Sequence, residues 1–177
     1  MTDRAQTQQA FEAFIVSHLR ILLRLARRLL REPADAEDLV QETCLKAFRS
    51  FHQFSPGSNA KAWLVTILVN TWRDRMRKVS HMPLALSFDE IDEFVQLRHP
   101  DRTPEAIAMQ NHMGHLVRLA IDDLPPEFRL VVLLADVEGF TYQEIADTVA
   151  CPLGTVMSRL HRGRRLLHTT LHALIEE

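Results

Sequence analysis

The chain has 177 residues, of which 46% are hydrophobic and 25% charged, and its net charge is -2; this length allows one medium domain or two small ones. Only 5 glycines and 8 prolines argue against disorder and against a turn-rich all-β fold, and two cysteines give no disulfide framework or cysteine-based zinc cluster. The N-terminus lacks signal-peptide character and no apolar run approaches the roughly 20 residues of a membrane helix, so we expect a soluble, cytoplasmic protein without membrane insertion.

The first half of the chain predicts three helices. From about residue 8 to 31, apolar residues recur at helical spacing and arginines fill the opposite face. We expect Asp35 to cap a second helix that runs to about Phe51. After a loop at residues 52–59, a third helix over 60–78 ends in a basic turn.

The middle of the chain breaks this pattern. Residues 79–103 contain two prolines, with a third at Pro104, and a run of acidic residues, which predicts an interdomain linker with at most a short helical turn. Helical periodicity resumes at about Pro104 and continues to Leu124. A further helix over 127–138 should end at Gly139, a residue that accepts the left-handed backbone of a helix terminus.

The last part of the chain predicts a helix-turn-helix. Helices over about 142–149 and 154–174 flank a tight turn at 150–152, and duplex DNA is commonly read by the second helix of such a pair. Its basic stretch contains four arginines between Arg159 and Arg165, and arginine can read guanine through two hydrogen bonds. An ordinary amphipathic helix with a solvated basic face is the alternative. The residues expected near its exposed front are Thr155, Met157, Ser158, Arg159, His161 and Arg162.

The buried side of this motif is also predictable. Five apolar residues of the pair should pack against apolar residues of the preceding helix. The two sets are Ile145, Ala146, Val149, Val156 and Leu160, and Val131, Leu134 and Val137.

No motif indicates an enzyme. The chain has no glycine-rich phosphate loop, no His-Glu-x-x-His and no nucleophile elbow. His161, His168 and His172 lie roughly along one helix face, and two of them have metal-ligand spacing, but an arginine-rich helix favours a solvated or phosphate-facing surface. We therefore predict no metal and no cofactor. Cys44 is expected in the core, and Cys151 in the exposed turn.

Five segments resemble bacterial extracytoplasmic-function (ECF) sigma factors. Residues 124–129, 138–146 and 154–162 look like the C-terminal domain of that family. Residues 33–48 are similar to its helix that binds core RNA polymerase, and residues 54–74 to its promoter-melting segment. The segments occur in the family's order along nearly the whole chain.

The resemblance implies an all-α fold with two small domains joined by a flexible linker. Residues 1–79 would be a sigma-2 domain, 80–103 the linker and 104–177 a sigma-4 domain with the helix-turn-helix. Such a protein binds core RNA polymerase and promoter DNA, recognises -35 and -10 elements and aids melting, and the further partner that the resemblance implies is an anti-sigma factor. A stand-alone helix-turn-helix regulator is the alternative, but it leaves residues 1–79 unexplained.

The resemblance also implies roles for individual residues. Polymerase would be met by Asp38, Gln41, Glu42 and Lys46. The -10 strand would be met by Phe54, Ser58, Asn59, Asn70, Arg73, Asp74, Arg77 and Lys78, with Ser58, Asn59 and Asn70 forming a pocket for one extruded base. The -35 element would be read by Thr155, Ser158, Arg159, His161, Arg162 and Arg165.

Three further residues and two segments carry additional interpretations. Trp63 and Trp72 either stack on bases or pack in the core, and the spacing of Trp63 favours packing. Met157 stands where several relatives carry a polar or basic residue, so a base contact there is not expected. Residues 136–139 and 157–165 resemble a subgroup governed by zinc-binding, redox-responsive anti-sigma factors.

Overall fold

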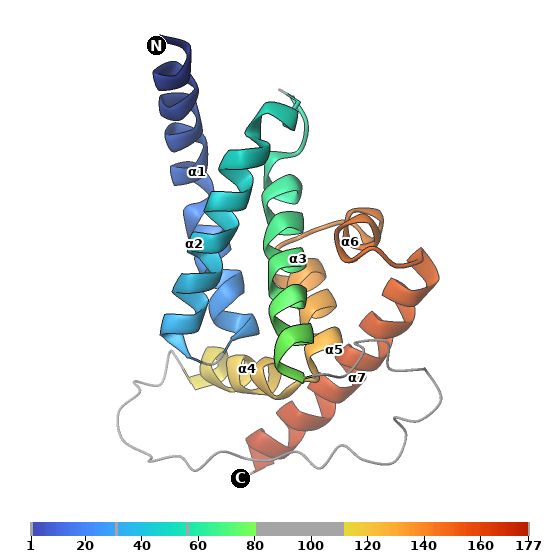
Figure 1. Cartoon of the computed structure of the whole chain (residues 1–177). Helices are drawn as coiled ribbons and strands as arrows, with labels where there is room; N and C mark the ends of the chain where they lie inside the picture. Colours follow the sequence, from blue (N-terminus) through green and yellow to red (C-terminus); the bar gives the residue numbers. More distant parts are fainter. Residues whose placement is uncertain (1, 31, 56, 81–111, 177) are drawn as a thin grey trace.

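The computed structural model describes residues 2–30, 32–55, 57–80 and 112–176, and within these ranges it contains helices and no strand (Figure 1). The fold is therefore all-α, as predicted. The described residues form an N-terminal half and a C-terminal half. The predicted linker falls largely in 81–111, which lies outside the described residues, as does the expected resumption of helix at Pro104.

The N-terminal half consists of three long helices and a short 3-10 turn. These are α1 (Thr2–Leu29), α2 (Pro33–Ser50), η1 (Phe51–Gln53) and α3 (Ala60–Ser80). The first helix is uninterrupted and starts earlier than its apolar pattern indicated. The largest fully buried side chains between the three helices are Leu22, Leu25, Leu39, Leu64, Leu68 and Trp72.

The expected cap of α2 is wrong. Glu32 occupies the N-cap position without a side-chain hydrogen bond, and Pro33 begins the helix. A proline is well suited to the first helical position, because its fixed backbone angle is helical and no amide is needed there. Asp35 therefore lies inside the first turn, where its charge still suits the helix dipole.

The tryptophans both serve packing. Trp72 is 1% exposed, with its indole Nε1 lacking a hydrogen-bond partner among the described residues, so stacking on a base is excluded for it in this conformation. Trp63 is half-buried in an aromatic cluster, where its ring centroid lies 5.2 Å from that of Phe54 and 6.1 Å from that of Phe14. The predicted DNA-contacting residue Phe54 is thus a packing residue of the loop before α3.

The C-terminal half contains four α-helices. They are α4 (His112–Asp123), α5 (Pro126–Val132), α6 (Tyr142–Val149) and α7 (Leu153–Glu176), with a π-helical turn η3 (Leu133–Val137) after α5.

Gly139 ends η3 as expected and has φ +69°, which favours glycine. The predicted apolar contacts are buried except at Val137, which is 46% exposed. The π-helical turn shifts the helical register, so that Val137 no longer follows the inward face set by Val131 and Leu134.

Helix α7 crosses α5 at a glycine. A Cβ atom on Gly163 would lie 2.9 Å from Val132 Cγ2 and 3.3 Å from Phe128 Cβ. The close approach therefore requires a residue without a side chain, and it fixes how α7, with its basic stretch, sits on the rest of the half.

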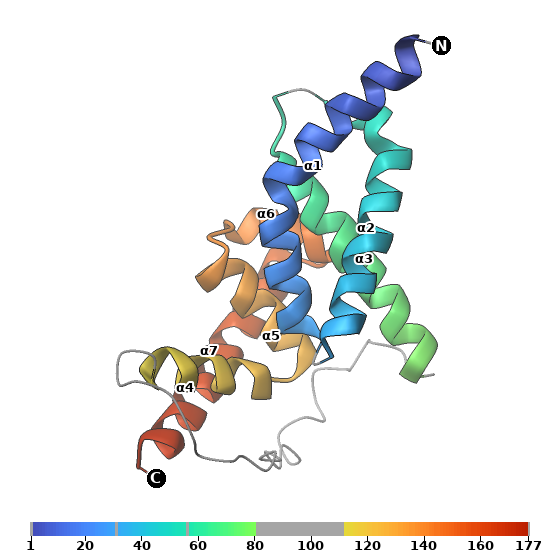
Figure 2. The same ribbon diagram turned by 90° about the vertical axis from the view of Figure 1, so that its left-hand side faces the viewer.

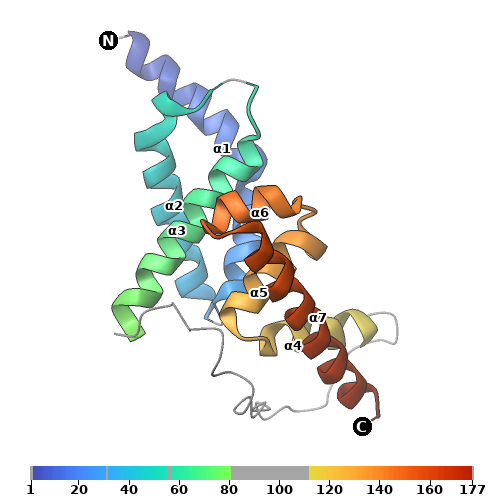
Figure 3. The same ribbon diagram turned by 90° about the vertical axis from the view of Figure 1, so that its right-hand side faces the viewer.

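The two halves pack against each other through α3 with α6 and α1 with α5 (Figure 3). Across the first contact, Thr66 Oγ1 donates a hydrogen bond to Thr148 Oγ1 at 3.3 Å. Across the second, Arg129 donates to the carbonyl of Arg28 at 3.4 Å. Among the helices described, none has the length and apolar character needed to cross a membrane.

Candidate nucleic-acid interface

The helix-turn-helix is built by local sequence. Thr141 caps α6 in a reciprocal capping box: its side chain accepts from the Glu144 amide, and the Glu144 carboxylate accepts from the Thr141 amide at 2.8 Å. Such a box satisfies two otherwise unpaired amides. Ala150 ends α6 with φ +48°. The Thr155 amide then donates to the Pro152 carbonyl at 2.9 Å, which starts α7.

Helix α7 presents its predicted readers along one exposed side. His161, Arg162 and Arg165 are exposed, whereas Thr155, Ser158 and Arg159 are half-buried. Met157 is 53% exposed and lies between them. This side of α7 therefore carries polar and basic side chains, three of them exposed, and their contact with DNA stays a prediction.

One arginine of this basic stretch, Arg164, is held by an ion pair within the C-terminal half. Arg164 forms two hydrogen bonds with the Asp136 carboxylate, at 3.1 and 2.6 Å. Hydrogen bonds to Asp136 and Tyr142 hold the pKa of Arg164 above its ordinary value. This side chain ties α7 to the π-helical turn, which the count of arginines alone could not reveal.

The start of α6 meets the start of α3. The Asn59 side chain donates to the Glu144 carboxylate at 2.7 Å and accepts from the Ala62 amide at 3.1 Å. The first contact joins a predicted -10 residue to the helix-turn-helix, and the second makes Asn59 a cap of α3.

Acid should destabilise the contact between the starts of α3 and α6. Hydrogen bonds, first from the Thr141 amide and then from its hydroxyl and from Asn59, hold the pKa of Glu144 below its ordinary value. A depressed folded-state pKa gives stability that is present above the unfolded pKa of about 4.3 and is lost as pH falls through the folded value. Glu144→Gln should therefore reduce the fall in the urea midpoint between pH 5 and pH 3.

The matched control for this prediction is Asp147→Asn. Asp147 lies on the same helix, is exposed and accepts one hydrogen bond from Gln143 at 3.0 Å. Its substitution should leave the pH dependence of the urea midpoint unchanged. If the urea midpoint fell equally with pH in the two variants, the acid sensitivity could not be assigned to Glu144.

The predicted -10 residue Arg73 of α3 is influenced by the charge of a predicted -35 residue of α7. Arg73 is half-buried, and its pKa is lowered by burial and then by the positive charge of Arg159. Two arginines assigned to different promoter elements thus repel each other across the contact between the halves.

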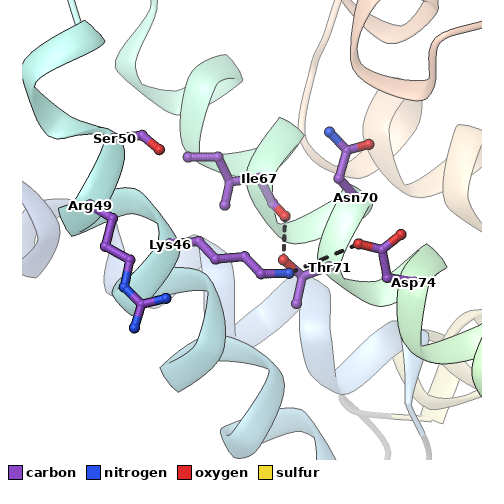
Figure 4. A pocket seen from close by; sticks show the side chains of 7 residues that line it. All are labelled: Lys46, Arg49, Ser50, Ile67, Asn70, Thr71 and Asp74. Atoms are coloured by element: carbon purple, nitrogen blue, oxygen red, sulfur yellow. Dashed lines mark hydrogen bonds and ion pairs between the residues drawn. The ribbon is translucent and has the colours of Figure 1, made fainter.

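A pocket of about 360 Å³ lies between α2 and α3 (Figure 4). Asn70 and Asp74 come from α3, and Lys46 and Arg49 reach it from α2, with Lys46 Nζ 4.0 Å from the Asp74 carboxylate. The expected grouping of Asn70 with Ser58 and Asn59 is not found. Both residues precede the start of α3 at Ala60, which lies ten residues, or about 15 Å along the helix, from Asn70, and neither lines this pocket.

The remaining predicted -10 residues occupy the exposed end of α3. Arg77 and Lys78 are exposed, and Arg77 Nη1 lies 3.7 Å from the Asp74 carboxylate. Ser58 is also exposed, and its hydroxyl donates to the Ser55 carbonyl at 2.7 Å.

The predicted polymerase surface on α2 divides into two parts. Asp38 and Gln41 are exposed, whereas Glu42 and Lys46 are half-buried between α2 and α3. Glu42 accepts from Arg75 at 3.0 Å. Burial raises its pKa, but hydrogen bonds from Lys46 and Arg75 outweigh that effect and leave the pKa below its ordinary value. Glu42 and Lys46 therefore hold α2 against α3 in this arrangement.

Sequence reasoning missed two exposed apolar residues beside Gln41. Leu45 is 59% exposed and Phe48 41% exposed. Leu45 follows Gln41 by four residues and therefore lies on the same side of the helix. The sequence could have revealed them, because neither Leu45 nor Phe48 belongs to the buried face of α2.

The buried carboxylate of Glu138 links the halves. Arg24 donates to it through Nε at 2.8 Å and through Nη2 at 2.7 Å, and the Glu138 side chain is 2% exposed. Lys61 adds a hydrogen bond to the Glu138 carbonyl and lies 3.8 Å from its carboxylate. The hydrogen bonds with Glu138 raise the pKa of Arg24.

No group of three potential metal ligands occurs among the residues that the structure describes. The His168 and His172 ring centroids lie 6.3 Å apart on α7. Cys44 is half-buried, as expected for a packing residue, and burial raises the pKa of its thiol. Cys151 in the turn is half-buried too.

These features define a helical protein with a helix-turn-helix and a second, basic helical half. Sigma-70 region 2 matches residues 14–81, and Sigma-70 region 4 matches residues 115–167. The two matches cover, in order, the two halves described above.

Known relatives agree. The chain is 37% identical to the ECF RNA polymerase sigma factor SigE of Mycolicibacterium smegmatis over 92% of its length, and spans 62% of that relative. It is 32% identical to the ECF RNA polymerase sigma-E factor of Haemophilus influenzae, covering 80% of this chain and 77% of the relative. The chain therefore belongs to the ECF group of the sigma-70 family of RNA polymerase sigma factors. Its members are transcription initiation factors and not catalysts in themselves.

Solved structures show the same architecture. The Bartonella quintana sigma factor RpoE, in complex with the anti-sigma factor NepR, is similar with a TM-score of 0.69 and 30% identity, over 93% of this chain and 98% of that one. CnrH, in complex with the cytosolic domain of CnrY, shares the fold with a TM-score of 0.64 at 23% identity.

Proposed function

We propose that this protein binds core RNA polymerase in the cytoplasm and directs it to promoters by recognising a -35 and a -10 element. The observation that carries the proposal is the pairing of an exposed, basic recognition helix, α7, with a separate basic helix, α3, in one chain. Domain limits of 1–79 and 104–177 around a linker at 80–103 accompany it. The region 2 and region 4 matches support these limits.

Helix α7 is proposed to read the -35 element as duplex DNA. Arg162 and Arg165 are exposed on it, and Ser158 lies beside the half-buried Arg159. Phosphate contacts place such a helix and base contacts give it specificity.

The pocket between α2 and α3 is proposed to receive one unstacked base of the non-template -10 strand. Asn70 supplies both a donor and an acceptor for a base edge, and it is exposed at the pocket. Lys46 and Arg49 supply positive charge from the other wall, as a single-stranded DNA track requires. This places Lys46 on the DNA side of α2 as well as in its predicted polymerase surface.

The experiment that tests this function is promoter melting by the reconstituted holoenzyme. Asn70→Ala should reduce open-complex formation, read by permanganate reactivity of -10 thymines, while duplex -35 binding stays unchanged. Loss of one base-edge contact corresponds to about a 5- to 150-fold reduction. Gln9→Ala, which removes an exposed amide on α1 outside the pocket, is the matched control, and normal melting by Asn70→Ala would remove the pocket from the mechanism.

The same reconstitution separates this function from a stand-alone regulator. A sigma factor should bind its promoter specifically only together with core polymerase, whereas a helix-turn-helix regulator should bind the same duplex alone. Specific binding by the isolated protein, unchanged on adding polymerase, would favour the regulator.

Polymerase is proposed to bind the exposed strip of α2 around Asp38, Gln41 and Leu45. Asp38→Lys combined with Leu45→Lys should abolish co-purification with core enzyme, because it reverses one charge and places another in an apolar contact. These two exposed side chains are better targets than Glu42, whose substitution would also loosen α2 from α3. Helicity by circular dichroism should not change.

The control for the polymerase surface is Glu37→Lys. Glu37 is exposed on the same helix but about 100° away from Asp38 around its axis, so binding should persist. Retained binding by the Asp38→Lys, Leu45→Lys variant would move the polymerase interface elsewhere.

An anti-sigma factor is proposed as the regulator, by analogy with the Bartonella quintana relative that was solved with one. Residues 136–139 and 157–165 support a zinc-binding, redox-responsive partner, and that support is sequence resemblance alone. Affinity capture from the source cells, followed by zinc analysis of the captured complex before and after oxidation, tests the class. A zinc-free partner, or one that stays bound after oxidation, would exclude this subgroup.

A further inference from the structure

An arginine-lined groove runs along α1 on the side facing α4. Its volume is about 740 Å³, and Figure 2 shows α1 and α4 from this side. The apolar part includes Val16, 69% exposed, and Leu19, 36% exposed. Among the residues that the structure describes, no acidic side chain lines it. The residues that line the groove are Val16, Leu19, Leu23, Arg20, Arg24, Arg27, Arg28 and Arg118.

Part of the groove's positive charge is met by neighbouring acids. Arg24 binds Glu138, and Arg28 Nη1 lies 3.4 Å from the Asp122 carboxylate. Arg20 and Arg118 make no ion pair with any other residue that the structure describes. The groove therefore combines exposed apolar surface with unneutralised arginines on both of its walls.

This combination fits an acidic amphipathic peptide better than nucleic acid. Phosphates would pair with the arginines but would leave the apolar surface of Val16 and Leu19 against a charged backbone. A peptide segment with apolar residues at helical spacing and carboxylates between them can cover both kinds of surface.

The chain itself contains such a segment. Residues 88–97 read Phe-Asp-Glu-Ile-Asp-Glu-Phe-Val-Gln-Leu, with four carboxylates and no basic residue. The apolar residues Phe88, Ile91 and Val95 have the i, i+3, i+7 spacing that places side chains on one face of a helix. We propose that segment 88–97 docks in the arginine-lined groove between α1 and α4 of its own chain.

The length of chain on either side permits this docking. Leu97 precedes His112, the first residue of α4, by 15 residues, and Phe88 follows Ser80, the last of α3, by eight. Fifteen extended residues reach up to about 50 Å and eight about 27 Å. The whole of α1, with 28 residues, is only about 42 Å long.

Proteolysis of the full chain by a glutamate-specific protease tests the docking. Cleavage after Glu90 and Glu93 reports on the segment, and cleavage after Glu105 gives a reference in the same molecule. Arg20→Glu with Arg118→Glu should speed cleavage at Glu90 and Glu93 about tenfold relative to Glu105, because a docked segment must open before it is cut.

Two controls sharpen this result. Arg49→Glu with Arg165→Glu makes the same change in net charge away from the groove and should leave the cleavage ratio unchanged. Adding Asp89→Lys and Asp92→Lys to the groove variant should restore slow cleavage, relative to the same two changes made in the unaltered groove.

Three outcomes would overturn the proposal. The cleavage ratio could stay the same in the groove variant, or rise equally in the control variant. Protection could instead increase with protein concentration over about a hundredfold range, which would assign the groove to a second copy of the chain. The assay contains neither DNA nor polymerase, so its failure leaves the proposed function intact.

Discussion

Glu138→Lys is expected to separate the two halves of the protein. The variant removes the carboxylate to which Arg24 donates two hydrogen bonds. It also places a third positive charge beside Arg24 and Lys61. Small-angle scattering should therefore show a larger radius of gyration than that of the unaltered chain, with the difference shrinking as salt screens the repulsion.

The size of this effect follows from burial. Removing one partner of a fully buried ion pair costs about 3–5 kcal/mol. Glu138 is buried, but the Arg24 side chain is 47% exposed, so solvent screening reduces the expected loss of contact free energy to about 1–3 kcal/mol. A loss of that size is enough to shift a two-state equilibrium about 5- to 150-fold.

Asp136→Lys provides the matched control. It makes the same change in charge two residues away, but Asp136 pairs with Arg164 inside the C-terminal half. That variant should lose some stability of α7 without changing the distance between the halves. Arg24→Glu in the Glu138→Lys background should bring the halves together again, and an unchanged radius for Glu138→Lys alone would contradict the role of the pair.

Arg159→Ala with Arg162→Ala is expected to have the larger effect on DNA. Each well-placed bidentate contact between arginine and guanine contributes about 1–3 kcal/mol of discrimination. The double variant should therefore lose about 25- to 20,000-fold in -35-dependent promoter selectivity if both contacts are made and their effects add. Competition binding of the holoenzyme to a library randomised at the -35 element measures this.

The control for the DNA prediction is His168→Ala. His168 is exposed on the same helix, further from the turn, and its loss should leave selectivity intact. Unchanged selectivity in the double arginine variant would show that α7 positions the protein on phosphates and that bases are read elsewhere.

The helix-turn-helix was predictable because its information is local. Thr141, Gly139 and Pro152 each determine the backbone within a few residues, and the structure places helix boundaries beside all three. The all-α fold followed from periodicity in the same way. The predicted N-cap of α2 was wrong because Asp35 and Pro33 both signal a helix start, and the proline determined the first helical position.

The candidate sites were harder to predict from the sequence because they depend on contacts between residues far apart in the chain. Arg24 and Glu138 are 114 residues apart, and no spacing rule connects them. Asn59 was predicted to read a base, yet it caps α3 and binds Glu144. Likewise, the helical spacing of Trp72 did not show how deeply the fold would bury it.

Because the halves contact each other, the measured affinity for a promoter complex depends on two quantities. These are the intrinsic affinity of the open form and the fraction of molecules that are open. Asn59 binds Glu144 where the halves meet, so a complex that uses Asn59 draws on the fraction of molecules that are open. The apparent dissociation constant is the intrinsic one divided by that fraction. Each 1.4 kcal/mol favouring the closed form thus weakens apparent binding about tenfold, and substitutions at Glu138 can tighten promoter complexes without touching either DNA or polymerase.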